Sequence, residues 1–136
     1  MKLWDDRDNL MFQFNYGEGY SHYVNDLNSV DVPDAVFDTT TGQLKTLPVI
    51  SYYVAVQKWW TSNLRSNFNY SYVDVDNEDF QDDAAYHKTR RAIANIIWSP
   101  TARVDFGAEF LYGYRENKDS DSANAAQLQL SGTYRY

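Results

Sequence analysis

Five arginines occupy odd-numbered, polar positions of segments in which polar and apolar residues alternate. A guanidinium group stays charged at neutral pH and binds carboxylates and phosphates through paired N–H donors, so its chemistry is the recognition of anions. Asp105 and Glu109 share this phase and would pair with the arginines or shape the field around them. The arginines are Arg65, Arg91, Arg103, Arg115 and Arg135.

Two interpretations of these arginines stay open in the sequence. In the first, they line a water-filled path and favour anions, and Arg7 joins them from the turn before the first strand. In the second, they avoid lipid because an arginine at the bilayer midplane costs about 2–4 kcal/mol, and they make structural ion pairs with Asp105 and Glu109. Arg90 alone has the opposite phase.

Catalytic and metal chemistry find little support in the residues. The chain has no cysteine, which excludes disulfides, zinc ribbons and thiol catalysis. His22 and His87 lack a third ligand nearby, and no serine stands in a Gly-x-Ser-x-Gly elbow. Asp105 and Glu109 would lie about 13 Å apart along a strand, too far for a glycosidase pair. We therefore expect no catalytic residues, no metal and no cofactor.

Acidic residues gather in two polar segments. They could bridge divalent cations to lipopolysaccharide phosphates or hold calcium, but neither segment has the Asp-x-Asp-x-Asp-Gly spacing. We therefore interpret both segments as solvated loops. The residues are Asp31, Asp34 and Asp38 in the first segment, and Asp76, Glu78, Asp79, Asp82 and Asp83 in the second.

The composition indicates strands that have one wet face and one apolar face. The 136 residues carry a net charge of −7, and the pI near 4.6 argues against nucleic-acid binding. The mean hydropathy is −0.63, and no apolar run is long enough for a transmembrane helix. Yet 17% of the residues are aromatic. This mixture is typical of antiparallel sheets and of membrane barrels.

Alternation with a period of two predicts six strands. Leu128 and Leu130 between Gln127 and Gln129 are the clearest case. Several segments exceed the usual length of about 5–6 residues and reach what a tilted barrel strand needs to cross a bilayer. The expected strands are 9–22, 49–60, 63–75, 87–98, 102–116 and 124–136, and Lys2 to Trp4 could end a seventh.

The connections alternate between short turns at 60–63 and 98–101 and long polar loops at 24–47, 77–86 and 117–123. Outer-membrane barrels have this arrangement, with the long loops outside the cell. The C-terminus would then lie on the periplasmic side. The membrane-interface aromatics would be Trp60, Trp98, Tyr134 and Tyr136.

Four ordered groups of residues resemble the C-terminal portion of the DcaP-type outer-membrane porins. The last strand also resembles the terminal assembly signal of barrel proteins, with aromatic Tyr134 and Tyr136, although Gly132 stands one position later than the usual glycine. The groups are Asn15–Tyr20, Trp60–Thr61 with Leu64–Asn67, Trp98–Thr101 with Phe106–Glu109, and Leu111–Asn117.

This resemblance implies a trimeric, many-stranded barrel that passes small anionic solutes such as dicarboxylates. Such a porin would need a signal peptide and more strands, so we interpret residues 1–136 as a single-domain fragment. The expected fold is all-β, an antiparallel up-and-down transmembrane β-barrel of which about six strands are present. Alone, they would form an open curved sheet or close by association.

The expected function is passive diffusion of small hydrophilic solutes through the bacterial outer membrane, with anions favoured by the inward arginines. The expected partners are membrane lipid, lipopolysaccharide, anionic solutes and two further copies of the parent protein, without nucleic acid. Tyr53 and Trp59 could also contact solute. Two alternatives stay open: a structural or adhesive outer-membrane barrel, and a soluble β-barrel that binds a small apolar ligand with its aromatic face inward.

Overall fold

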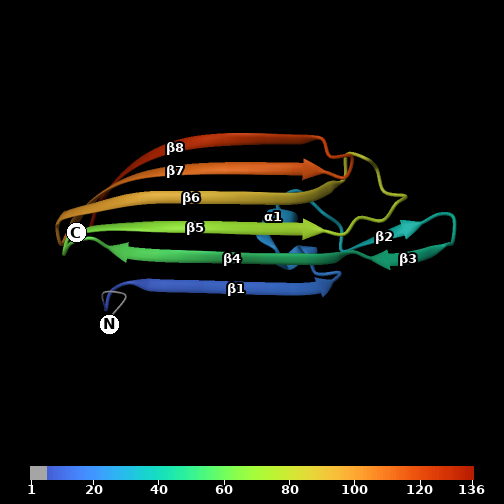
Figure 1. Ribbon diagram of the computed structural model, residues 1–136, viewed down its shortest axis with the longest axis horizontal. Helices are drawn as coiled ribbons and strands as arrows, with labels where there is room; N and C mark the ends of the chain where they lie inside the picture. Colours follow the sequence, from blue (N-terminus) through green and yellow to red (C-terminus); the bar gives the residue numbers. More distant parts are fainter. Residues whose placement is uncertain (1–5) are drawn as a thin grey trace.

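Six long strands form one antiparallel sheet in the computed structural model, which describes residues 6–136 (Figure 1). The order β1-β4-β5-β6-β7-β8 places consecutive long strands side by side, which confirms the predicted all-β, up-and-down arrangement. The sheet is open, with β1 and β8 at its edges. The bounds are β1 Asn9–Glu18, β4 Pro48–Trp59, β5 Leu64–Val75, β6 Tyr86–Thr101, β7 Val104–Asn117 and β8 Ser122–Tyr134.

The segment between β1 and β4 contains structure where the sequence predicted only a loop at 24–47. A 3-10 helix η1 (Ser21–Tyr23) and a one-turn helix α1 (Asn25–Asn28) precede a hairpin of β2 (Ala35–Asp38) and β3 (Gln43–Thr46). None of the helices within residues 6–136 has the length and apolarity needed to cross a bilayer. The predicted strand end at Lys2 to Trp4 lies outside the described residues.

Across all six long strands, even-numbered residues are paired with even-numbered residues of the neighbouring strand. Val54 is paired with Phe12 on one side and with Tyr70 on the other, and the even-to-even matching continues through β6, β7 and β8. Because side chains alternate across a strand, all even-numbered residues of the regular ladder share one face. We call this the apolar face and the opposite one the polar face.

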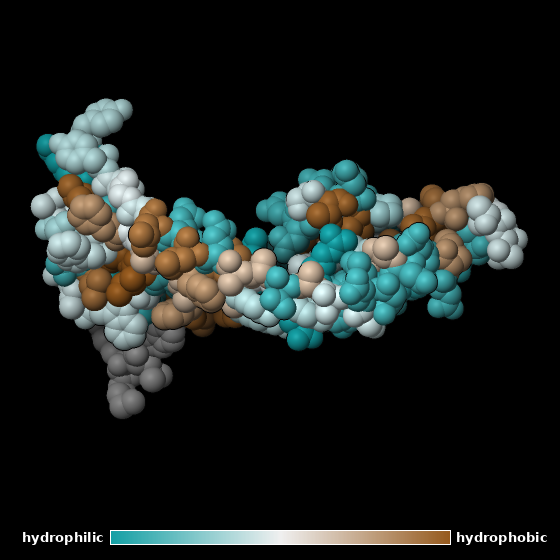
Figure 2. Space-filling model, turned by 90° about the horizontal axis from the view of Figure 1, so that it is seen from above, coloured by the Kyte–Doolittle hydropathy of each residue, from teal (hydrophilic) through white to brown (hydrophobic). Residues whose placement is uncertain are grey.

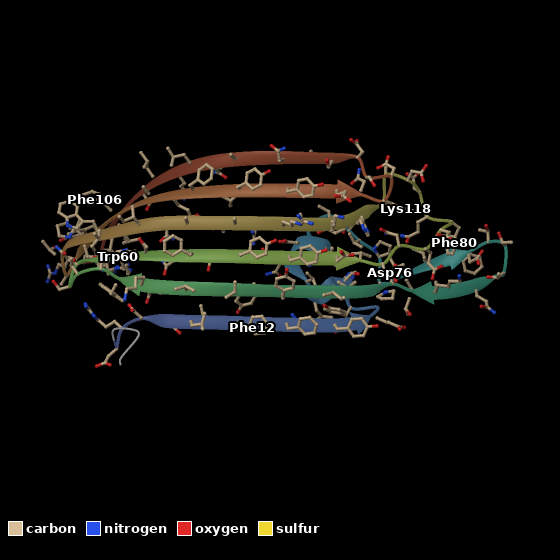
Figure 3. All side chains as sticks on the ribbon, in the orientation of Figure 1. Phe12, Trp60, Asp76, Phe80, Phe106 and Lys118 are labelled. Atoms are coloured by element: carbon tan, nitrogen blue, oxygen red, sulfur yellow. The ribbon has the colours of Figure 1, made fainter. Side chains whose placement is uncertain are left out.

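Several large apolar side chains are widely exposed on the apolar face. Phe12 is 67% exposed, Leu128 70% and Leu130 75%. Figure 3 shows Phe12 on β1, Trp60 and Phe106 near the short turns, and Asp76, Phe80 and Lys118 at the loop end. Figure 2 shows hydrophobic residues gathered over the part of the sheet next to the short turns, and mostly hydrophilic residues with some hydrophobic ones towards the long loops. The apolar face is thus left without a cover by the described residues.

The buried core lies on the polar face, at the loop end of the sheet. Leu27 of α1 is fully buried against a cluster that includes Val49, Val73 and Val75, and these three odd positions belong to β4 and β5. Tyr86 joins the same cluster because a bulge between Tyr86 and Lys88 shifts the phase of β6 at its start. The short helix therefore packs on the polar side of the sheet, behind β4 and β5 in Figure 1.

Most strand boundaries differ from the predicted ones by one or two residues, and three of the differences have an identifiable local cause. The first strand ends at Glu18, not at 22, because Gly19 takes a φ of +64° that turns the chain towards η1. β6 continues through Pro100 to Thr101, since a bulge between Trp98 and Thr101 accommodates the missing N–H. The β6–β7 turn consequently falls at residues 102–103, and Arg103 lies in this turn, outside the strand that we predicted from residue 102.

Candidate functional site

The structure places four of the five predicted arginines at the two ends of the polar face. Arg65 and Arg135 lie near the short turns, and Arg91 and Arg115 lie towards the long loops. Arg135 follows β8 and is held by its backbone N–H, which donates to the carbonyl oxygen of Arg103. The phase of the strands therefore brings four of the five arginines to one face, whereas Arg103 is in a turn.

Asp105 gathers two of these arginines at the short-turn end. Its carboxylate accepts a 2.6 Å hydrogen bond from Ser99 Oγ, forms an ion pair with Arg135, and lies 3.7 Å from Arg65 Nη2. The Arg65 guanidinium also lies 5.2 Å from the ring centroid of Trp59, and Arg7 lies 4.6 Å from the same ring. Arg65 and Arg135 thus have the structural pairing that one interpretation of the sequence predicted.

A row of side-chain amides crosses the middle of the polar face. Gln57 Nε2 donates to Asn67 Oδ1 at 3.0 Å, and Asn67 Nδ2 donates to Asn95 Oδ1 at 2.9 Å. Asn95 Nδ2 donates in turn to Glu109 Oε2 at 3.1 Å. Glu109, which the sequence paired with an arginine, accepts from an amide because its cross-strand neighbour is Asn95. The three amides present neutral hydrogen-bonding groups on this face, and the row ends at the Glu109 carboxylate.

A cavity of about 380 Å³ lies between the α1 segment and the polar face. Tyr20 fixes the segment through a 3.1 Å hydrogen bond between its Oη and Ser51 Oγ. Arg91 forms an ion pair with Asp26 of α1, with 3.8 Å between Nη1 and Oδ1, and 46% of the Arg91 side chain is exposed. The cavity therefore holds an accessible guanidinium. Its lining also includes Gln13, Asn15, Asn25, Tyr53 and Ser71.

Arg115 occupies the polar face above this cavity. Its guanidinium lies 5.2 Å from the ring centroid of Tyr86, and its Nε donates to Asn117 Oδ1 at 3.2 Å. Within residues 6–136, no carboxylate forms an ion pair with it. Of the strand arginines on the polar face, Arg115 thus has no ion-pair partner among the described carboxylates, whereas Arg91 has a long, partly exposed pair with Asp26.

Aromatic residues mark both ends of the apolar face. At the short-turn end, Trp98 stacks on Phe106 with ring centroids 6.0 Å apart, and Trp60 Nε1 donates to Ser66 Oγ at 3.0 Å. Tyr134 ends β8 on this face, and Tyr136 follows the strand. At the loop end lie Tyr52, Tyr70, Tyr72, Tyr112 and Tyr114.

The histidines and loop acids have local structural partners. His87 Nδ1 lies 3.0 Å from the carbonyl oxygen of Val75, at the bulge of β6, and His22 lies 3.5 Å from Asp34. Lys45 Nζ pairs with Glu78 at 3.0 Å and ties the β2–β3 hairpin to the next loop. Among residues 6–136, no group of three His, Asp or Glu side chains is arranged to hold a metal.

Sequence reasoning missed the amide row and the residues contributed by α1. The amides were detectable, since Gln57, Asn67 and Asn95 all have odd numbers, but only the register shows that they are neighbours. The sequence contains no pattern that predicts the positions of Asp26 and Tyr20, because these positions depend on how the segment that contains α1 folds back over the sheet.

Comparison with known proteins supports the fold. Neither a protein family nor a curated protein matches the sequence. A search of solved structures finds the crystal structure of the outer membrane channel DcaP of Acinetobacter baumannii, with a TM-score of 0.75 and 18% sequence identity. The match covers 96% of this chain and 37% of the channel chain. The chain thus shares its strand arrangement with a little over a third of an outer-membrane channel.

Proposed function

We propose that the chain forms part of the wall of an outer-membrane channel through which small hydrophilic solutes diffuse, with small anions such as dicarboxylates favoured. The observation that carries this proposal is Arg91, whose guanidinium lines the cavity between α1 and the polar face and stays exposed although it forms an ion pair with Asp26. Cationic groups along a water-filled path lower the barrier for anions. Arg115 supplies a second charge nearer the loops.

The distribution of polar residues supports lipid contact at the apolar face. In a water-soluble protein, a helix or further strands would be expected to cover the apolar side of a sheet. Here α1 covers the polar side, and the exposed apolar side chains have aromatic rows at both ends. Aromatic girdles that flank an apolar band are typical of outer-membrane barrels. This arrangement supports the channel over a soluble barrel with an aromatic interior.

We further propose that the short turns and the C-terminus face the periplasm, with the long loops outside the cell. Barrels of this class have short periplasmic turns and longer external loops. In this orientation α1 narrows the path from the external side, and the amide row lies below it.

The test is the reversal potential of the protein, isolated as the cell makes it, in a planar bilayer under a salt gradient. We expect anion preference in the wild type and a clear shift towards cations in the double variant Arg91→Gln/Arg115→Gln. Arg90→Gln is the matched control, because it removes the same charge from the neighbouring position on the opposite face. It should leave the reversal potential unchanged.

Two results would contradict this proposal. A cation-selective wild type, or a double variant with the wild-type reversal potential, would remove the role of the two arginines. Membrane insertion without any conductance would instead favour the structural barrel, for which the pairing of Arg65 and Arg135 with Asp105 is the supporting observation.

A further inference from the structure

Arg90 is a cation on the apolar face, the side of the sheet opposite the proposed solute path. Its even number puts it beside Tyr72 of β5 and Tyr114 of β7, in one row across three strands. The guanidinium lies 5.8 Å from the ring centroid of each tyrosine. Arg90 is thus held between two aromatic rings and is itself exposed.

The next row towards the loops consists of three charged residues. They pair with one another or with the neighbouring tyrosines. Lys88 lies between Asp74 and Glu116, and its Nζ is 2.7 Å from a Glu116 carboxylate oxygen. Tyr72 Oη donates to Asp74 and Tyr114 Oη donates to Glu116, each at 2.5 Å. Both carboxylates are therefore engaged by other donors.

This pairing leaves Arg90 without a carboxylate. No carboxylate of residues 6–136 forms an ion pair with its guanidinium, although an arginine on a lipid-facing surface is costly. The N–H donors of a guanidinium match the oxygens of a phosphate and bind them in pairs. The missing counter-ion is therefore expected from outside the described part of the chain.

The position of Arg90 along the strand indicates which anion is within reach. Eight residues separate it from Trp98 of the opposite aromatic row, which is about 26 Å along the strand and roughly 20 Å in height at the usual tilt of ~40°. Arg90 thus lies at the level of the loop-end aromatic girdle, and its side chain is long enough to reach the headgroup layer.

We propose that Arg90, held between Tyr72 and Tyr114, binds the phosphate of a lipopolysaccharide molecule in the outer leaflet. The inference rests on the proposed orientation, in which the loop end of the apolar face meets that leaflet. It differs from the solute path because it uses the opposite face of the same sheet. Arg90 and Arg91 are adjacent in sequence, and the strand directs one to lipid and the other to water.

The test measures binding of diphosphorylated lipid A to the protein, isolated as the cell makes it, in a neutral detergent by native mass spectrometry. Arg90→Gln is expected to weaken binding about tenfold, the effect of losing a charge-assisted hydrogen-bonded pair. Arg91→Gln, the control on the opposite face, should bind like the wild type. The wild type should also bind lipid A stripped of its phosphates about tenfold more weakly.

Equal binding by both variants and the wild type, or an equal loss in both variants, would overturn the phosphate site. If Arg90→Gln does not fold, the test uses Arg90→Lys and the phosphate-free lipid. The lysine variant should bind lipid A more weakly than the wild type but more tightly than expected for Arg90→Gln. Wild-type protein that binds phosphate-free lipid A as tightly as diphosphorylated lipid A would contradict the proposal. Normal, anion-selective conductance together with lipid A binding that Arg90→Gln does not weaken would refute only this inference. A wild type that does not insert into bilayers would refute the channel itself.

Discussion

At the scale of single residues, Asp105 is the carboxylate of the polar face that pairs with two arginines. It holds Arg135 and Arg65, and its third partner is the hydroxyl of Ser99. Asp105→Asn removes the negative charge and frees both arginines towards the proposed path. We expect a lower thermal midpoint and a reversal potential shifted further towards anions.

Glu109→Gln provides the control for this variant. Glu109 has the same phase on the same strand but accepts from Asn95 rather than from an arginine. Its replacement removes the same charge without freeing a cation, so its effect on the reversal potential should be the smaller one. A larger shift from Glu109→Gln than from Asp105→Asn would show that the pairing at Asp105 does not govern the charge of the face.

The contrast between Asp105 and Glu109 also shows how far the sequence predicts side-chain partners. Alternation placed both carboxylates on the polar face together with the arginines, and the register confirms that shared face. Alternation contains no information about lateral neighbours. Those depend on the register, which places Asn95 beside Glu109.

At the scale of elements, the β2–β3 hairpin depends on the ionised form of Asp38. The hydroxyl of Thr41 donates to Asp38 Oδ2 at 2.7 Å, and the backbone N–H of Thr40 donates to Oδ1 at 2.8 Å. The Thr41 hydroxyl is the main cause that lowers the pKa of Asp38 below its ordinary value of 3.8. The stabilisation is therefore present above pH 3.8 and is lost as the pH falls through the lowered folded value.

Hydrogen exchange of the hairpin amides, corrected for intrinsic rates, checks this expectation. Acidification below about pH 4 should reduce protection in the wild type. Thr41→Val should reduce protection at neutral pH and flatten its acid dependence, because the hydroxyl donor is lost. Thr40→Val keeps its backbone donor and should behave like the wild type. Identical acid profiles for Thr41→Val and the wild type would contradict the role of that hydrogen bond.

The long strands were predictable because period two extends over many residues in each of them. The short elements η1, α1, β2 and β3 were not, since three or four residues are too few to show a period. The bulge at Tyr86 was hidden for a similar reason, because a single extra residue reverses the phase only locally. The fold was thus predictable at the level of the sheet, and the covering of its polar face was not.

At the scale of the whole molecule, the assignment of lipid to one face predicts opposite tolerance for charge at adjacent positions. Leu128→Arg introduces a cation on the apolar face opposite Phe110, and Gln127→Arg introduces one on the polar face opposite Leu111. The first should destabilise the membrane-inserted protein by about 2–4 kcal/mol, and the second much less. Urea titration in lipid vesicles, followed by heat-modifiable gel mobility, measures the difference.

Comparable losses in both variants would show that neither face meets hydrocarbon. A larger loss in Gln127→Arg would indicate that the polar face is the buried one, which would favour a soluble protein. The residues were chosen because neither side chain makes a side-chain hydrogen bond with another residue of the described chain, so the introduced charge is the main change.

The up-and-down order has a further consequence for how such a sheet changes its size. Each pair of neighbouring long strands leaves and returns to the same end, and the even-numbered ladder continues unchanged from β1 to β8. A gene duplication or deletion that spans one complete hairpin would therefore preserve both the inside–outside alternation and the side on which the chain finishes. Loss of one strand alone would leave the terminus on the wrong side of the bilayer, so barrels of this kind should diversify in steps of two.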